Sequence, residues 1–417
     1  MKQFFISILL SLIIWPAFTY ADKASELKTQ IDSRQAEIAK LDAQIASFEK
    51  DLNATSKQAG TLQNALATLN LTIKKLDSQA KKTETEISAS KLKIDELNLN
   101  IKKTSGNITE HEQAMRELLR ELNHSNREGI TEAVLGYERL SDFWAGEVRL
   151  ENLEEAVQQS AQELRTLKTD LGVKVDTTEK EKKKLEGLKL ELLDQKKIAD
   201  AERVKQTVLL AQTKNQEANY KKLLATSRTQ REAFAKELFE FESQLKLAID
   251  TSALPTARKG ILAWPVANPQ ITQAFGKTVD AKRLYASGTH NGIDLRASVG
   301  TAILSAASGV VAGTGDTDLT CRGASYGKWV LVKHDNGLAT LYAHLSLIKV
   351  AANQRLAESQ LLGYSGQTGY ATGPHLHFTV GAATGVAIQS FKSKVCAGTY
   401  TMPIFDTRAY LDPILYL

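Results

Sequence analysis

The C-terminal third of the chain holds most of its histidines, and their spacing suits a metal site. Five of the seven histidines follow residue 289. In HNGID, His290 stands four residues before Asp294, and in GPHLHF, His375 stands two residues before His377. Residues i and i+2 of a strand face the same side, so we expect His375 and His377 to point into one site. His344, in LYAHL, adds a further imidazole.

Two histidines and one carboxylate suit catalytic zinc, which keeps three protein ligands and a water. Along a straight strand, the Cα atoms of His290 and Asp294 would lie ~13 Å apart. The chain must therefore turn between them, and Asn291-Gly292 favours a turn. The remaining two histidines would position or deprotonate the attacking water and stabilise an oxyanion. His334, in KHDNG, is expected in a turn between strands, outside the site.

Proline divides the chain into two parts with different compositions. Six of the seven prolines lie between Pro255 and Pro413, and none lies between residues 17 and 254. The proline-free part is rich in Lys, Glu, Leu, Ala and Gln, a composition typical of long helices. Residues 260–417, punctuated by glycine and proline, indicate a β-rich globular domain. This division excludes a single globular domain, a disulfide-stapled mini-protein and a multispan membrane protein.

A heptad pattern predicts a coiled coil in the proline-free part. One heptad position stays apolar or small from Ile31 to Leu122, which is typical of a coiled coil. The pattern breaks near residue 124, and we expect a helical elbow at 125–150 and a second helical stretch from about Leu150 to Ile249. Two arms of about 100 residues, each on the order of 150 Å long, then form an antiparallel hairpin. The alternative is one unbroken parallel dimer.

The first 21 residues resemble an export signal. A lysine precedes an apolar run that is too short to span a bilayer, and small residues follow it. We expect residues 1–21 to be a signal peptide and the mature chain to work outside the cytoplasm, in the periplasm or cell-wall space. The alternative is an uncleaved membrane anchor. A short linker is expected at 251–259, because Pro255 interrupts helix there.

The two cysteines both lie in the C-terminal domain, 75 residues apart. In an oxidising compartment, one disulfide between Cys321 and Cys396 is the simplest arrangement, and two buried thiols are the alternative. Residues 256–417 carry 14 basic and 8 acidic side chains, a formal charge of +6. This favours a polyanionic partner, unless the charge only keeps the domain soluble. No arginine-rich run or basic patch interleaved with aromatics indicates nucleic acid.

Residues 260–417 resemble the LytM/lysostaphin-like zinc metallopeptidases, which cut peptide bonds in peptidoglycan. The resemblance rests on these segments: WPV (264–266), FG (275–276), HNGIDL (290–295), ASGVV (307–311), YGKWVLVKHDNG (326–337), LYAHL (341–345) and GYSGQTGYATGPHLHFTV (363–380). It implies that His290, Asp294 and His377 bind Zn²⁺ and that His344 and His375 are catalytic.

The whole architecture resembles the EnvC-type murein hydrolase activators, which combine a signal peptide, a coiled coil and a LytM-like domain. Those activators typically lack zinc ligands and switch on separate amidases, whereas this chain retains the full set. Two other departures are Thr379, where the family usually has an acidic residue, and an inserted stretch, Asp316–Ala324.

The expected fold is α+β and multidomain: a signal peptide (1–21), a coiled-coil rod (22–250), a linker (251–259) and an antiparallel β-sheet domain (260–417). The expected function is that of a secreted zinc metalloendopeptidase acting on peptidoglycan during wall remodelling or division. The alternative is a non-catalytic activator or scaffold for separate murein hydrolases. The coiled coil would then bind a murein hydrolase or a division-complex protein, or form a homo-oligomer.

Overall fold

The computed structural model describes residues 17–56, 60–125, 140–245, 247, 249, 254, 256–284 and 287–417. Most of the expected signal peptide and elbow, and part of the expected linker, therefore lie outside the described residues. The chain divides into two compact units, residues 1–42 with 81–192 and residues 43–80 with 193–417. Long helices followed by an antiparallel sheet confirm the expected α+β class.

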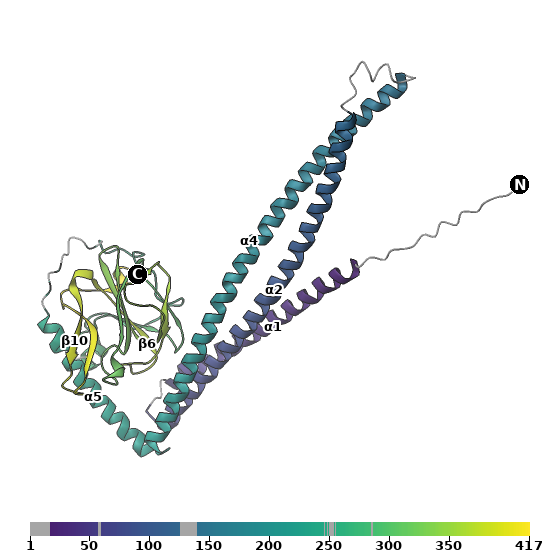
Figure 1. The fold of residues 1–417 in the computed structure, drawn as a ribbon. Helices are drawn as coiled ribbons and strands as arrows, with labels where there is room; N and C mark the ends of the chain where they lie inside the picture. The colour runs from purple at the N-terminus through teal and green to yellow at the C-terminus, as the bar shows by residue number, and fades with distance from the viewer. Residues whose placement is uncertain are drawn as a thin grey trace. The chain divides into compact units, whose positions relative to one another are not determined.

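The first unit is built from parts of three long helices, α1 (Ala17–Ser56), α2 (Leu62–Ser125) and α4 (Leu140–Thr213). Ion pairs join α2 to α4 between Glu121 and Arg149 at 2.7 Å and between Glu112 and Lys168 at 2.9 Å. Residue numbers fall along α2 as they rise along α4, so the two helices run antiparallel (Figure 1). The expected antiparallel hairpin is confirmed for these two helices.

The expectation of two uninterrupted arms was wrong, because each arm contains a break. In the first arm, Thr61 caps the start of α2 by accepting a hydrogen bond from the Asn64 amide at 3.2 Å. Gly60 precedes it, and glycine followed by a capping residue favours a new helix start. α1 then folds back on α2, with Lys82 bound to Asp42 at 2.6 Å. The heptad stripe continues across Gly60, so it did not reveal this turn.

The second arm breaks after α4, where Lys214 and Asn215 have φ angles of 49° and 55°. Left-handed backbone ends a helix, and asparagine tolerates it well. A shorter helix, α5 (Glu217–Gln244), follows. The second helical stretch thus starts earlier and ends earlier than the expected 150–249.

The C-terminal domain is built on an antiparallel β-sheet (Figure 1). This sheet has ten strands, and its main path has the order β1-β2-β9-β6-β5-β4-β7. β3 pairs with β8, β8 with β6, and β12 with β9; a separate hairpin joins β10 to β11. The strands are β1 (Ile271–Gln273), β2 (Ile293–Arg296), β3 (Ala302–Leu304), β4 (Gly309–Asp316), β5 (Lys328–His334), β6 (Leu338–Ile348), β7 (Arg355–Leu356), β8 (Leu361–Ser365), β9 (His375–Ala382), β10 (Val386–Lys392), β11 (Thr399–Phe405) and β12 (Tyr410–Leu411). A short helix, α6 (Val279–Leu284), lies between β1 and β2.

Three central strands position the chemistry. β9 lies between β2 and β6, and His377 on β9 stands opposite Asp294 on β2 and Ala343 on β6. Phe378, Ile293 and Leu295 on these strands are fully buried in the main core, on which the sheet rests. Packing of this kind fixes strand register, because a slip by one residue would turn every side chain to the opposite face.

The two cysteines form the expected disulfide, Cys321–Cys396, with Cα atoms 5.7 Å apart. It ties the inserted stretch around the 3₁₀ helix Thr317–Leu319 to the β10–β11 hairpin. A crosslink closing a loop of this length stabilises by roughly 4 kcal/mol in the chain-entropy model. In the part of the chain that the structure describes, no helix is long and apolar enough to cross a membrane.

Candidate active site

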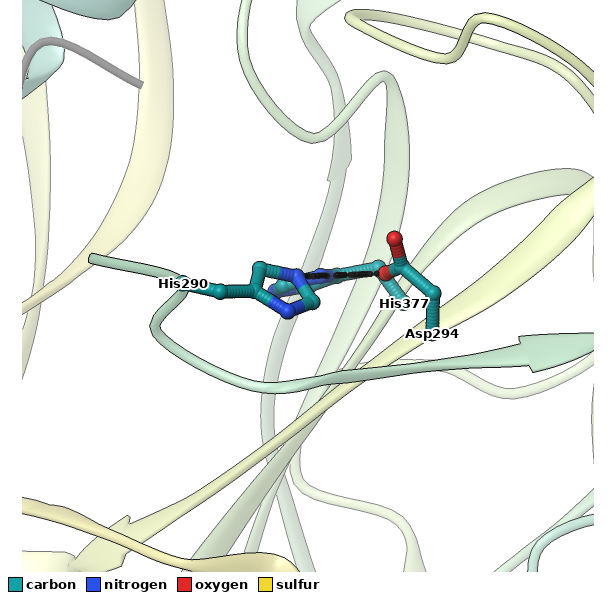
Figure 2. Close-up of side chains that lie close together, drawn as sticks. All are labelled: His290, Asp294 and His377. Atoms are coloured by element: carbon teal, nitrogen blue, oxygen red, sulfur yellow. Dashed lines mark hydrogen bonds and ion pairs between the residues drawn. The ribbon is translucent and has the colours of Figure 1, made fainter. Parts of the chain in front are cut away.

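His290, Asp294 and His377 form one compact cluster at the junction of β2 and β9 (Figure 2). The Oδ1 atom of Asp294 lies 3.3 Å from Nε2 of His290 and 3.0 Å from Nδ1 of His377. The two ring nitrogens are 3.1 Å apart. All three residues are buried, and one ligand atom from each lies within 4.8 Å of the others. The structure thus brings the three sequence-predicted ligands together.

The turn that joins His290 to Asp294 depends on Gly292. A Cβ atom at this position would lie 2.5 Å from the carbonyl oxygen of Phe378, so only glycine fits against β9. Before the turn, His290 and Gly276 exchange two backbone hydrogen bonds of 2.9 Å each. The turn expected at Asn291-Gly292 is therefore present, and it starts from a fixed backbone position.

Each ligand imidazole is oriented by a contact to its other nitrogen. Nδ1 of His290 lies 3.0 Å from the carbonyl oxygen of Ala274, which only accepts hydrogen bonds. This nitrogen therefore carries the proton and leaves a lone pair on Nε2, which faces the cluster. Nε2 of His377 lies 3.0 Å from the Thr379 hydroxyl, and its Nδ1 faces the cluster. Thr379 thus contacts His377 through a hydroxyl, at the position where the metallopeptidases that this sequence resembles usually have an acidic residue.

His344 and His375 lie beside the three-residue cluster. The rings of His344 and His375 are 4.8 Å apart, and the ring of His344 is 5.9 Å from that of His377. Nδ1 of His344 donates to the carbonyl of Thr368 at 2.8 Å, and Nδ1 of His375 donates to that of Gly373 at 2.8 Å. Both rings therefore have a free Nε2, and that of His375 lies 3.6 Å from Asp294.

His334 lies away from this group, as the sequence suggested. Its nitrogens contact the carbonyl of Ser308 at 3.2 Å and the hydroxyl of Thr340 at 2.7 Å. Both nitrogens have structural partners, which explains why this histidine stays outside the site.

Burial and neighbouring charges set the protonation of the cluster. Burial alone would raise the pKa of Asp294, but the close contacts of its carboxyl group with His290 and His377 hold it well below its usual range. Burial lowers the pKa of His377. Burial, together with the nearby His375 and His377, holds the pKa of His344 well below its usual range. The carboxylate is thus charged and these two rings are neutral near pH 7, the states that suit metal ligands and a general base.

The backbone at His344 is strained. Its φ angle is +61°, a left-handed conformation that costs a non-glycine residue on the order of 1–3 kcal/mol. The amide of His344 is held by the carbonyl of Tyr326 at 2.9 Å. Nearby, a Cβ atom on Gly369 would lie 2.2 Å from the Gly327 amide nitrogen, so close packing there fixes the adjacent Thr368 carbonyl. The strain falls on a residue whose ring lies beside the cluster.

Helix α5 also reaches this site, which the sequence analysis did not foresee. Phe234, Leu238 and Glu242 of α5 line the same cavity as His344 and His377. The only sequence signal was a row of apolar residues at helical spacing, and heptad position alone does not identify a partner surface. The cavity residues Asn291 and Tyr326, and the neighbouring Tyr410, were likewise outside the predicted set.

Residues 288–389 match Peptidase family M23. The cell division protein DipM of Caulobacter vibrioides is 37% identical over 136 residues, which are 31% of this chain and 20% of DipM. The DD-carboxypeptidase/endopeptidase Mpg of Neisseria meningitidis is 36% identical over 114 residues, 27% of this chain and 25% of Mpg. The peptidoglycan DD-endopeptidase ShyA of Vibrio cholerae is 40% identical over 90 residues, 21% of this chain and 19% of ShyA.

The chain spans about a fifth to a quarter of the length of these relatives, and the matching part holds all five site histidine and aspartate residues. Long helical segments precede the matching residues. On this match and on the site just described, the C-terminal part of the chain, residues 288–389, is a domain of peptidase family M23.

Proposed function

We propose that this chain is a zinc metalloendopeptidase that hydrolyses peptide bonds in peptidoglycan. The observation that carries the proposal is the cluster of His290, Asp294 and His377, with three ligand atoms within 4.8 Å of one another. Its donor set of two imidazoles and one carboxylate fits zinc, and one nitrogen of each ring and one charged oxygen face the same point.

In this proposal the three ligands hold the ion and the remaining histidines handle protons. A bound zinc would supply Lewis-acid polarisation and acidify a bound water. His344, neutral near pH 7 and anchored through Nδ1 to Thr368, presents Nε2 as a proton acceptor. His375, anchored through Nδ1 to Gly373, presents its Nε2 beside Asp294, where the ring protonated at both nitrogens would donate a hydrogen bond to developing oxyanion charge.

The substrate class follows from the names of the relatives and from charge. Mpg and ShyA are named as a carboxypeptidase/endopeptidase and an endopeptidase, and ShyA as one of peptidoglycan. The C-terminal domain carries the formal charge of +6, which would draw it to an acidic wall polymer. We further propose export by residues 1–21, and a rod that binds a division-complex protein, another murein hydrolase or a second copy of the chain.

A second candidate is a non-catalytic activator of separate murein hydrolases. The position of α5 along the cavity favours an activator, because an activator would expose its binding surface only when a signal displaces the covering helix. Phe241 of α5 stacks on Phe391 with ring centroids 4.1 Å apart. Glu237 accepts hydrogen bonds from the Ser393 hydroxyl at 2.8 Å and the Lys394 amide at 2.6 Å. These contacts hold α5 to the β10–β11 hairpin.

The test uses the full-length chain with α5 weakened by Leu238→Asp, loaded with zinc and incubated with purified sacculi. We expect release of soluble muropeptides, and no release after a further Asp294→Ala change. A zinc-loaded chain that releases nothing, yet accelerates an added amidase, would establish the activator instead.

A further inference from the structure

The cavity beside the metal residues contains a carboxyl group supplied by α5. Glu242 is 7% exposed, and its Oε1 accepts a hydrogen bond from the Tyr410 hydroxyl at 2.5 Å. The same oxygen lies 3.3 Å from Nδ2 of Asn291, which donates to it. Nδ2 of Asn291 also lies 3.2 Å from the Tyr326 hydroxyl and 3.1 Å from that of Tyr410. Two side chains of the β domain thus donate to one carboxyl oxygen, and the Tyr326 hydroxyl adjoins them through Asn291.

No lysine or arginine is among the described residues that line this cavity and its neighbour. Burial raises the pKa of Glu242 to about 7, although hydrogen bonds from Tyr410 and Asn291 oppose the rise. An acidic residue is a costly choice for a helix that only has to cover an apolar surface. Its presence indicates that the underlying surface requires an acceptor, because buried donors left without one cost about 1–3 kcal/mol each.

These donors belong to the substrate cavity rather than to α5. Asn291 follows His290 directly, and the ring of Tyr326 stacks on that of His377 with centroids 6.0 Å apart. Asn291 and Tyr326 line the same cavity as His344 and His377. When α5 leaves, the donors remain beside the metal residues, where a bound peptide would lie.

We propose that Asn291, Tyr326 and Tyr410 form a subsite for a carboxylate of the peptide substrate, which Glu242 occupies as an internal mimic while α5 is docked. The inference rests on the proposed endopeptidase function and narrows its substrates to peptides with a free carboxylate close to the scissile bond. A carboxyl group rather than a carboxamide is indicated because the side chain that occupies these donors is a glutamic acid, whose Oε1 accepts from both Tyr410 and Asn291.

The first arm of the test asks whether the vacated subsite binds a small carboxylate. Thermal unfolding of the full-length Glu242→Ala chain is followed in acetate and in neutral acetamide. We expect acetate alone to raise the melting temperature, in a saturable way, and a further Tyr410→Phe change to abolish the rise. Tyr400→Phe is the matched control, because Tyr400 contacts Glu237 of the same helix, 3.5 Å away, outside this cavity. Equal responses to acetate in all variants would overturn the subsite.

The second arm measures peptide binding by calorimetry. Two stem peptides differ only in a carboxylate or a carboxamide beside the scissile bond. Each peptide is titrated into the full-length chain that carries Leu238→Asp, which weakens the docking of α5, and His375→Ala, which prevents consumption of the peptide. Hydrogen bonds to charged groups contribute about 1.5–3 kcal/mol. Tyr410→Phe should therefore lower the affinity for the carboxylate peptide at least ~10-fold and the affinity for the carboxamide peptide less than ~3-fold.

Equal losses for the two peptides would overturn the carboxylate assignment. Binding does not require turnover, so the two proposals fail separately. If the variants bind the carboxylate peptide selectively but the chain with His375 intact releases no muropeptides, the proposed endopeptidase function is wrong and the proposed subsite stands. If muropeptides are released but the two peptides bind equally well, the endopeptidase function stands and the carboxylate subsite is wrong.

Discussion

Truncating Phe234 should release the active site from α5. Phe234 is 3% exposed, packs in the core cluster that joins α5 to the β10–β11 hairpin, and lines the cavity beside His344. A buried Phe→Ala change costs about 3–5 kcal/mol. If the docking of α5 absorbs even 3 kcal/mol of this loss, the undocked fraction rises by roughly 100-fold. Muropeptide release by the full-length chain should rise accordingly, until undocking is complete.

The assay compares Phe234→Ala with the parent chain at equal zinc content on the same sacculi. Hydrogen exchange of residues 230–244 reports independently whether α5 has become undocked. Leu262→Ala is the control, because Leu262 is 1% exposed in the main core and belongs to a different cluster from α5. It should destabilise the domain without raising the rate. An unchanged rate in Phe234→Ala, with α5 shown to be undocked by exchange, would refute the view that α5 covers a working site.

Three further results are expected. His344→Ala and His375→Ala should each keep zinc and slow hydrolysis by about 10²–10⁴-fold, the range for a lost proton-transfer group; loss of zinc from either variant would show it to be a ligand. Thr379→Val should weaken zinc binding by about 10–100-fold, measured by competition with a chelator, because Nε2 of His377 loses its partner; unchanged affinity would make Thr379 irrelevant to the site. The raised pKa of Glu242 stabilises docked α5 most fully below about pH 4.5 and progressively less as pH rises to about 7, so activity of the full-length chain should rise between about pH 4.5 and 7 more steeply than in Glu242→Gln; parallel profiles would contradict this.

The sequence predicted that His290, Asp294 and His377 lie together because the patterns that indicate this are local. The two-residue spacing of His375 and His377 places both on one strand, and Asn291-Gly292 supplies the turn that returns Asp294 to His290. The backbone carbonyls that orient the rings were not predictable, since their identity comes from loop geometry rather than from side-chain type. Thr379 looked like a departure from a pattern, and only its 3.0 Å contact with His377 showed how it substitutes.

The helices were predicted less completely than the site. The heptad stripe predicted helix, and the break near residue 124 favoured the antiparallel return, but neither records where each helix ends. Thr61 starts a new helix by capping, and Asn215 ends α4 through a left-handed backbone, both short-range effects that leave the apolar period intact. The docking position of α5 depends on contacts such as that of Glu237 with Ser393, two residues that are 156 positions apart in the sequence. Sequence periodicity carries no information about such pairs.

The most direct test of the central claim is the zinc content of the full-length chain and of its Asp294→Ala variant. Asp294 is the carboxylate of the three-residue cluster, and its pKa lies well below its usual range. We expect one zinc per parent chain, and loss of both zinc and muropeptide release in Asp294→Ala, also when Leu238→Asp weakens the cover. An Asp294→Ala chain that keeps stoichiometric zinc and full activity would contradict the assignment of this cluster as the catalytic metal site.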